Sequence, residues 1–155
     1  MVQRTYRRIC QGAYATLPLL AALLLVACAA PRGPGETAAL AVRVLEPPPG
    51  LARIFFYRTE NPFLIALEPE VVVNGRAVGR AVHGQAFYRD AKPGRYEIFL
   101  AGDTDNVVRF SAAPGERIYV KTEIDFNLVG SHLTAVRVDE STGRPEFLER
   151  IVRTP

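Results

Sequence analysis

Short apolar segments separated by turn signals fill the chain from Leu51 onward, and this spacing most limits the possible folds. The clearest signal lies at residues 70–82, where three valines run directly into Asn74-Gly75 and the apolar pattern then resumes. Asn-Gly accepts the positive φ angles of a type I′ turn, so this segment predicts a tight hairpin. Further strands are predicted at residues 51–58, 63–68, 85–91, 95–102, 107–112, 117–126 and 132–140. Strands at intervals of about 10 residues predict an antiparallel sandwich or barrel, and not a parallel α/β sheet.

At the carboxyl end, the spacing of the apolar residues changes from that of a strand to that of a helix. Pro145 suits a first helical turn, and Phe147, Leu148 and Ile151 share one face of a helix over residues 143–152. We expect a short terminal helix that packs on one sheet. Turns are expected at Lys92-Pro93-Gly94 and at residues 103–106.

The amino end has the pattern of a secretory signal peptide. Residues 1–8 carry three arginines and no acid, and residues 9–31 carry no charge around a Leu- and Ala-rich centre. The segment ends in Leu25-Val26-Ala27-Cys28, which resembles the bacterial lipobox. That resemblance implies cleavage before Cys28, diacylglycerol on its sulfur and acylation of the new amine. Residues 1–27 are therefore interpreted as the signal peptide and Cys28 as the lipid-attachment residue.

Two other interpretations of this segment stay open. The uncharged run is 23 residues long, and a bilayer needs about 20, so it could be a retained transmembrane anchor, although Pro18 makes it a mediocre one. Cys28 could also be only a small apolar residue at the end of a secretory signal.

Under the lipoprotein interpretation, the two cysteines cannot form a disulfide in the mature chain. Cys10 is removed with the signal and Cys28 carries lipid, so the folded part depends on its core alone. Three acyl chains would make the attachment effectively permanent. In lipoproteins an Asp after the lipidated Cys tends to retain the protein at the inner membrane. Ala29 stands there, which favours the outer membrane, facing the periplasm.

Residues 28–50 have the composition of a tether. They contain five prolines and three glycines, and as a flexible coil they would span roughly 25 Å. Part of this segment, residues 38–47, could also pair as an edge strand. The folded domain is assigned to residues 51–155.

The charge balance argues against nucleic acid as a partner. The net charge is +3, but Arg4, Arg7 and Arg8 lie in the signal, which leaves 16 basic against 16 acidic side chains. The mature chain therefore has no basic field.

The order of these segments is similar to known bacterial proteins. The series "ARIFFYR", "VVVNGRAVGR", "FYRDAKPGRYEIFL" and "GERIYVKTE" resembles a family of bacterial envelope lipoproteins known only as a domain of unknown function. "VVVNGRAVGR…AKPGRYEI" also looks like the PEGA-type module of bacterial surface proteins. The resemblance covers about residues 51–140 and implies a transthyretin- or immunoglobulin-like antiparallel β-sandwich. It brings no assigned catalytic residues.

Residues with catalytic or metal-binding chemistry are few. His83 and His132 lie in no metal-ligand pattern. Ser131 and His132 are neighbours on a predicted strand, so they point to opposite faces and cannot form a nucleophile–base pair. Asp103, Asp105 and Asn106 have the spacing of some calcium loops but lack the rest of that pattern, so a plain turn is favoured. No catalytic, cofactor or metal site is predicted.

Adjacent aromatic residues on one strand raise the question of an exposed ring. In the pairs Phe55-Phe56 and Phe87-Tyr88 one ring points to each side, so one could meet a partner protein or a glycan. The favoured alternative is a second buried face beneath the terminal helix.

These observations favour a non-enzymatic lipoprotein that acts as a binding or assembly module of the cell envelope, with an envelope protein as its partner. A glycan- or peptidoglycan-recognition domain is the alternative. An envelope hydrolase is the third possibility and is disfavoured.

Overall fold

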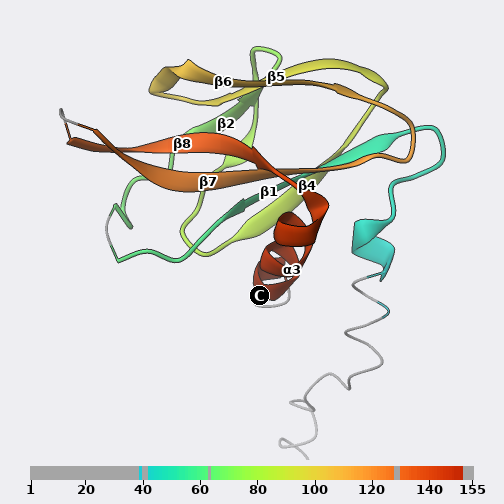
Figure 1. Ribbon diagram of the computed structural model, residues 1–155, viewed down its shortest axis with the longest axis horizontal. Coiled ribbons are helices and arrows are strands. Elements are labelled where there is room, and N and C mark those ends of the chain that lie inside the picture. Colours follow the sequence, from blue (N-terminus) through green and yellow to red (C-terminus); the bar gives the residue numbers. More distant parts are fainter. Residues whose placement is uncertain (1–38, 40–41, 63, 128–129, 152–155) are drawn as a thin grey trace, which may run out of the picture. The chain divides into compact units, whose positions relative to one another are not determined.

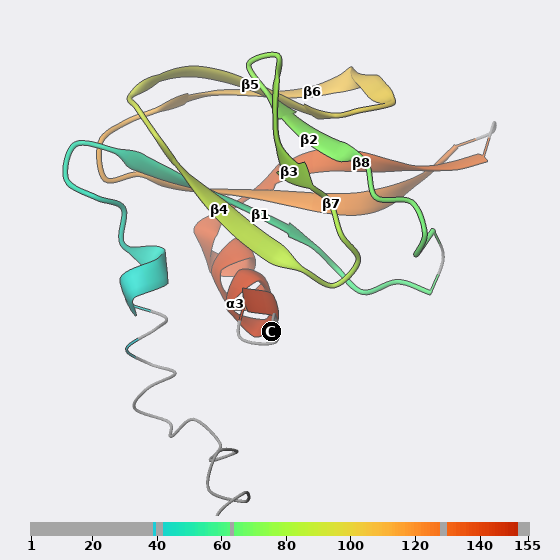
Figure 2. The ribbon, with the colours of Figure 1, turned by 180° about the vertical axis from the view of Figure 1, so that it is seen from behind.

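The chain forms two β-sheets and a carboxyl-terminal helix (Figures 1 and 2). The structure is a computed structural model that describes residues 39, 42–62, 64–127 and 130–151. The first sheet has the order β4 (Ala86–Ala91), β1 (Ala52–Arg58), β7 (Arg117–Asn127), β8 (Gly130–Val138). The second has the order β3 (Arg76–Arg80), β2 (Glu70–Val73), β5 (Gly94–Leu100), β6 (Asp103–Ala112). The prediction of a mainly antiparallel β-protein with a short terminal helix is confirmed.

One strand pair departs from the antiparallel pattern. β1 and β7 run parallel, with Phe55 opposite Tyr119, whereas the other pairs within the two sheets are antiparallel. Because β1 and β7 are far apart in sequence, no turn signal marks their pairing.

The β2–β3 hairpin is present as predicted. Asn74 and Gly75 have φ angles of 48° and 77°, the conformation that a type I′ turn requires. The Asn74 side chain also accepts a hydrogen bond from the Glu97 N–H at 2.8 Å and donates one to the Arg95 carbonyl at 3.2 Å. The turn residue therefore connects the hairpin to β5 as well as reversing the chain.

Two predicted elements of the strand region are wrong. Of the predicted strand 63–68, residue 63 lies outside the described residues, residues 64–66 form a bend and a turn, and residues 67–68 have no regular structure; Leu64 has a φ of 57°. β6 begins at Asp103, so residues 103–106 belong to a strand and the turn lies at Ala101-Gly102, where Gly102 has a φ of 95°. Glycine tolerates that angle without the steric cost of a Cβ, so it takes the turn position.

Helix α3 (Glu140–Ile151) begins earlier than predicted. Asp139 caps it, since its Oδ1 accepts a hydrogen bond from the Thr142 N–H at 2.9 Å. Pro145 consequently lies inside the helix and not in its first turn.

The main core lies between the two sheets. Its buried side chains come from both layers: Ile54, Phe56, Ile118, Val120, Leu133, Val71, Ile98, Leu100 and Phe110. A second cluster lies on the other face of the first sheet, beneath α3, and contains Phe55, Tyr57, Tyr119 and Phe147. All seven residues of β1 are buried, because this strand contributes to both clusters.

The segment before β1 packs on the second cluster. Residues 42–45 form a helical turn and not an edge strand, and Val44 and Leu45 are buried. The Arg53 guanidinium donates hydrogen bonds to the Arg43 and Val44 carbonyls. These residues, which were predicted to be part of the tether, contact the β-domain.

Candidate functional site

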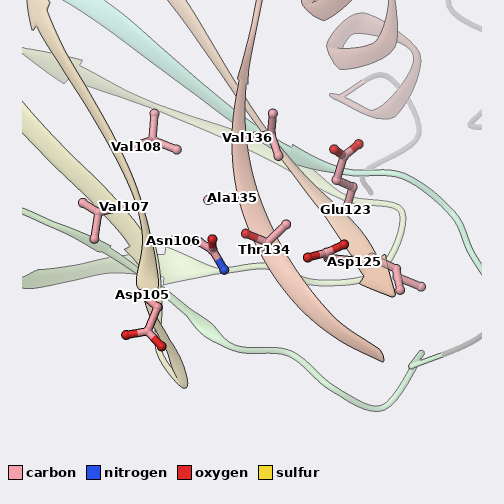
Figure 3. Close-up of a pocket in the computed structure, with 10 residues that line it drawn as sticks. Asp105, Asn106, Val107, Val108, Glu123, Asp125, Thr134, Ala135 and Val136 are labelled. Atoms are coloured by element: carbon pink, nitrogen blue, oxygen red, sulfur yellow. The ribbon is translucent and has the colours of Figure 1, made fainter. Parts of the chain in front are cut away.

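A groove lies between β6 and β8 (Figure 3). Each of these strands is at the edge of its sheet, so the groove follows an open side of the two layers. It has a volume of about 490 Å³ and is lined by residues 105–108 of β6, 123–125 of β7 and 134–136 of β8. Figure 3 shows the β6 residues on one side and those of β7 and β8 on the other. An edge strand presents unpaired backbone N–H and C=O groups, so the groove offers a template for a further strand.

The groove is acidic. Asp105, Glu123 and Asp125 place carboxylates around it. Two of these lie near basic side chains, since Lys121 Nζ lies 3.7 Å from Glu123 and His132 Nε2 lies 3.6 Å from Asp125. These carboxylates favour cations and hydrogen-bond donors over anions.

The structure brings together two of the motifs noted in the sequence. Asp105 and Asn106 line the groove from β6, and His132 contacts Asp125 from β8. Asn106 Nδ2 donates to Asp103 Oδ1 at 2.7 Å, while the other oxygen of that carboxylate is buried with no partner among the described residues. Within those residues no three His, Cys, Asp or Glu side chains are arranged to hold a metal ion.

The histidines serve different parts of the fold. His83 Nε2 lies 2.8 Å from both the N–H and the carbonyl of Asn61, so it contacts the loop between β1 and β2. His132 lies opposite Asp125 in the β7–β8 ladder, and Ser131 lies opposite Phe126. Neighbours on a strand point to opposite faces, so Ser131 and His132 do not form a catalytic pair.

The paired aromatic residues belong to the two cores. Phe55 stacks on Tyr119 at 4.6 Å and meets the edge of Phe147 at 4.8 Å beneath α3, and Phe56 stacks on Phe87 at 4.9 Å. The expected second buried face beneath the helix is therefore confirmed. The large apolar side chains that are most exposed in the described part of the chain are Val42, Ile65 and Leu67, none of them aromatic.

Sequence reasoning missed a group of buried arginines. Arg58 is 2% exposed and donates to the carbonyls of Leu64, Leu67 and Ala81 at 2.7, 2.5 and 3.0 Å. Arg53 is 5% exposed, bonds both oxygens of Asp90 and lies 4.2 Å from the Tyr88 ring centroid. One sequence signal could have indicated Arg53 and Arg58: each arginine lies near one end of an otherwise apolar segment. The structure places that strand inside a sheet.

The predicted lipid-attachment residue Cys28, and Cys10, lie outside the described residues. Among the residues described, no helix has the length and apolar character needed to cross a membrane. No protein-family model matches the chain, and a search of curated proteins finds no similar sequence. The functional argument therefore depends on the chemistry of this chain's own residues.

Proposed function

We propose that this protein is a lipid-anchored, non-enzymatic module of the bacterial cell envelope that binds a partner protein along the β6–β8 groove. The observation that carries the proposal is the groove itself, an open acidic channel between two sheet edges. The lipobox-like Leu25–Cys28 segment supports the anchor, and Ala29 supports the outer membrane, facing the periplasm.

The proposed fold type is a transthyretin- or immunoglobulin-like β-sandwich. Two four-stranded, mostly antiparallel sheets that share one core support this assignment. In such a sandwich the two open sides lie between the edge strands, which here are β6 with β8 and β3 with β4.

The proposed mode of binding is strand addition. An extended segment of the partner would pair its backbone with an edge strand, and its basic side chains would meet Asp105, Glu123 and Asp125. The lipid would confine the domain to a thin layer at the membrane, which raises its effective concentration for envelope partners. Backbone pairing supplies affinity and the carboxylates supply selectivity for a basic segment.

The anchor is tested by changing Cys28→Ser and following fractionation with membranes. We expect the wild-type chain to sediment with membranes and to carry lipid at Cys28 by mass spectrometry, and the variant to appear in the soluble periplasmic fraction. An unmodified Cys28 in the wild-type chain would remove this part of the proposal.

The groove is tested by placing a photocrosslinking amino acid at Val107, with Ala77 on edge strand β3 as the matched control position. We expect crosslinking at Val107 to one envelope protein, identified by mass spectrometry, and its loss in the charge-reversed Asp105→Lys/Asp125→Lys variant. The same charge reversal at Glu70, an exposed residue of β2, is expected to leave it unchanged. Equal crosslinking from both positions, or retention on isolated peptidoglycan that survives the groove variant, would refute binding through the groove.

A further inference from the structure

β3 and β4 are the edge strands on the other open side of the two layers (Figure 2). A second opening is lined by residues of both strands. Its volume is about 280 Å³. Ile54, Phe56, Val73, Val78 and Tyr96 supply most of its wall, and residues 89–92 complete it. In contrast to the acidic β6–β8 groove, this pocket is mainly apolar.

The floor of the pocket is part of the main core. Ile54 and Phe56 are each 2% exposed, yet both line the opening. The Phe56 ring stacks on Phe87, which lies so close to Gly79 that a Cβ there would come within 2.6 Å of it. An apolar chain that enters the pocket would therefore meet buried hydrocarbon, which is the surface that gains most from excluding water.

The rim of the pocket is positively charged. Arg89 reaches across to β3, where Nε and Nη2 donate to the Val78 carbonyl at 3.1 and 2.7 Å. Lys92 is exposed beside it. The rim carboxylate, Asp90, is already bonded by Arg53 through both oxygens, at 2.6 and 3.1 Å. The rim therefore presents two cations, and its one carboxylate is neutralised from within the protein.

We infer that this pocket binds a single-chain amphiphile with an anionic head group. The alkyl chain lies against Ile54, Phe56 and Val73, and the head group meets Arg89 and Lys92. The volume is just below the range of about 300–1,000 Å³ for ligand pockets, which suits a medium-length chain better than a bulky ring system. The proposal is independent of the β6–β8 groove, because the two sites share no lining residue.

The test uses the full chain carrying Cys28→Ser, so that no attached acyl chain competes, and decanoate as the probe. Calorimetry is expected to show saturable binding of decanoate below its micelle concentration. Decyltrimethylammonium, which has the same chain length and a cationic head, is expected to bind at least about tenfold more weakly. In methyl NMR, decanoate is expected to shift Ile54, Val73 and Val78. No saturable binding, equal affinity for both amphiphiles, or shifts confined to Ile65 and Leu67 would overturn the proposal.

Substitutions at neighbouring positions of β2 distinguish a loss of binding in the pocket from a nonspecific effect of the substitution. Val73→Phe fills the pocket and is expected to weaken decanoate binding about tenfold, the equivalent of roughly two buried methylenes. Val72→Phe, on the opposite face of β2, is expected to bind as the parent chain does. Arg89→Gln is expected to weaken decanoate binding and to lower its salt dependence. If Val73→Phe does not fold, the NMR map and the Arg89→Gln titration still decide the question, and unchanged affinity in Arg89→Gln contradicts the assigned head-group site.

Discussion

At the scale of single residues, three buried arginines stabilise the fold by donating hydrogen bonds to backbone carbonyls. Arg53, Arg58 and Arg150 are all buried, and each donates to backbone carbonyls outside the sheet ladders or at a strand end. A guanidinium has five N–H donors, so one side chain can satisfy several carbonyls at once. Burial lowers the pKa of Arg58, and the negative charge of Glu68 opposes that shift. The hydrogen bonds to three carbonyls compensate for removing this cation from water.

Replacement of Arg58 tests this role. Arg58→Met retains most of the side-chain volume but leaves the carbonyls of Leu64, Leu67 and Ala81 without their donor. We expect the free energy of unfolding in urea to fall by about 2–3 kcal/mol. As the control, Arg109→Met removes an exposed pair with Glu97 and should change it by less than about 0.5 kcal/mol. Equal effects of the two variants would show that the carbonyl contacts contribute nothing specific.

Two buried tyrosines differ in what their hydroxyls contact. The Tyr57 hydroxyl donates to Glu146 Oε2 at 2.8 Å, whereas the buried Tyr119 hydroxyl has no partner within the described part of the chain. Tyr57→Phe is therefore expected to lower the free energy of unfolding by about 1 kcal/mol, and Tyr119→Phe to leave it unchanged or raise it slightly. Urea denaturation of both variants at neutral pH measures the difference. The reverse order would show that the Tyr119 hydroxyl is the one with a stabilising partner.

The same tyrosines predict how stability changes at high pH. Burial, followed by the negative charge of Glu140, raises the pKa of Tyr119 to about 12, and burial, followed by Glu146, raises the pKa of Tyr57 as well. The folded state therefore keeps the proton that the unfolded chain loses near pH 10, so stability is complete below pH 10 and falls as the pH rises toward 12. The expected slope is about −1.4 kcal/mol per pH unit for each tyrosine. Tyr119→Phe should remove one such contribution, and an unchanged slope in that variant would contradict the assignment.

At the scale of elements, α3 is positioned by close approach to β7. A Cβ at Gly143 would overlap the Tyr119 side chain, so glycine allows the helix to pack directly on the ring. Phe147 then fills the space beside Phe55, and Arg150 donates to the Arg58 carbonyl at 3.1 Å. The helix therefore covers the second face of the first sheet, as the sequence predicted. Its apolar pattern indicated the Phe147 contact but not those of Gly143 and Arg150.

Gly143→Ala separates helix propensity from packing. Alanine is the better helix former by about 1 kcal/mol, so propensity alone predicts stabilisation. The overlap with Tyr119 predicts instead a loss of about 1–3 kcal/mol, because the helix must move away from the sheet. Thermal unfolding measures the outcome, with Arg144→Ala at the exposed neighbouring position as the control. A rise in melting temperature for Gly143→Ala would refute the close-packing account.

At the scale of the whole molecule, the packed part of the chain begins before β1. Val44 and Leu45 are buried under the second cluster, and Arg117 forms an ion pair with Glu46 at 3.0 Å. If Cys28 is lipidated, about 14 residues connect it to Val42, and a segment of that length reaches at most roughly 50 Å. With such an anchor, the point where the domain leaves its tether would be held against the first sheet, and this contact would limit the orientations of the domain at the membrane.

Limited proteolysis tests this attachment. Arg53→Met removes the donors to the Arg43 and Val44 carbonyls, and we expect trypsin to cleave after the exposed Arg43 at least about tenfold faster. Asp90→Asn preserves those donors and should give a smaller increase. Cleavage at the parent rate in Arg53→Met would show that Val44 and Leu45 hold the segment without it.

Local sequence signals account for the predictions of the fold that the structure confirms. The Asn74-Gly75 turn, the two-sided burial of β1 and the helix face that carries Phe147 all depend on neighbouring residues, and all three are confirmed. The errors at residues 64–68 and 103–106 have a common cause. Their local composition suits both a strand and a turn, and contacts from elsewhere, such as Arg58 to the Leu64 carbonyl, select one of the two.

The sequence by itself determined the β-rich class, most strand positions and the terminal helix, because backbone preference and side-chain alternation are local properties. The lipobox-like segment is also a property of the sequence, and the anchor at Cys28 stays a prediction. The tertiary structure alone decided the parallel β1–β7 pair, the buried arginines, the acidic β6–β8 groove and the apolar pocket between β3 and β4. Each of these depends on which distant segments pack together, and that choice follows from burial summed over the whole core rather than from any short stretch of chain.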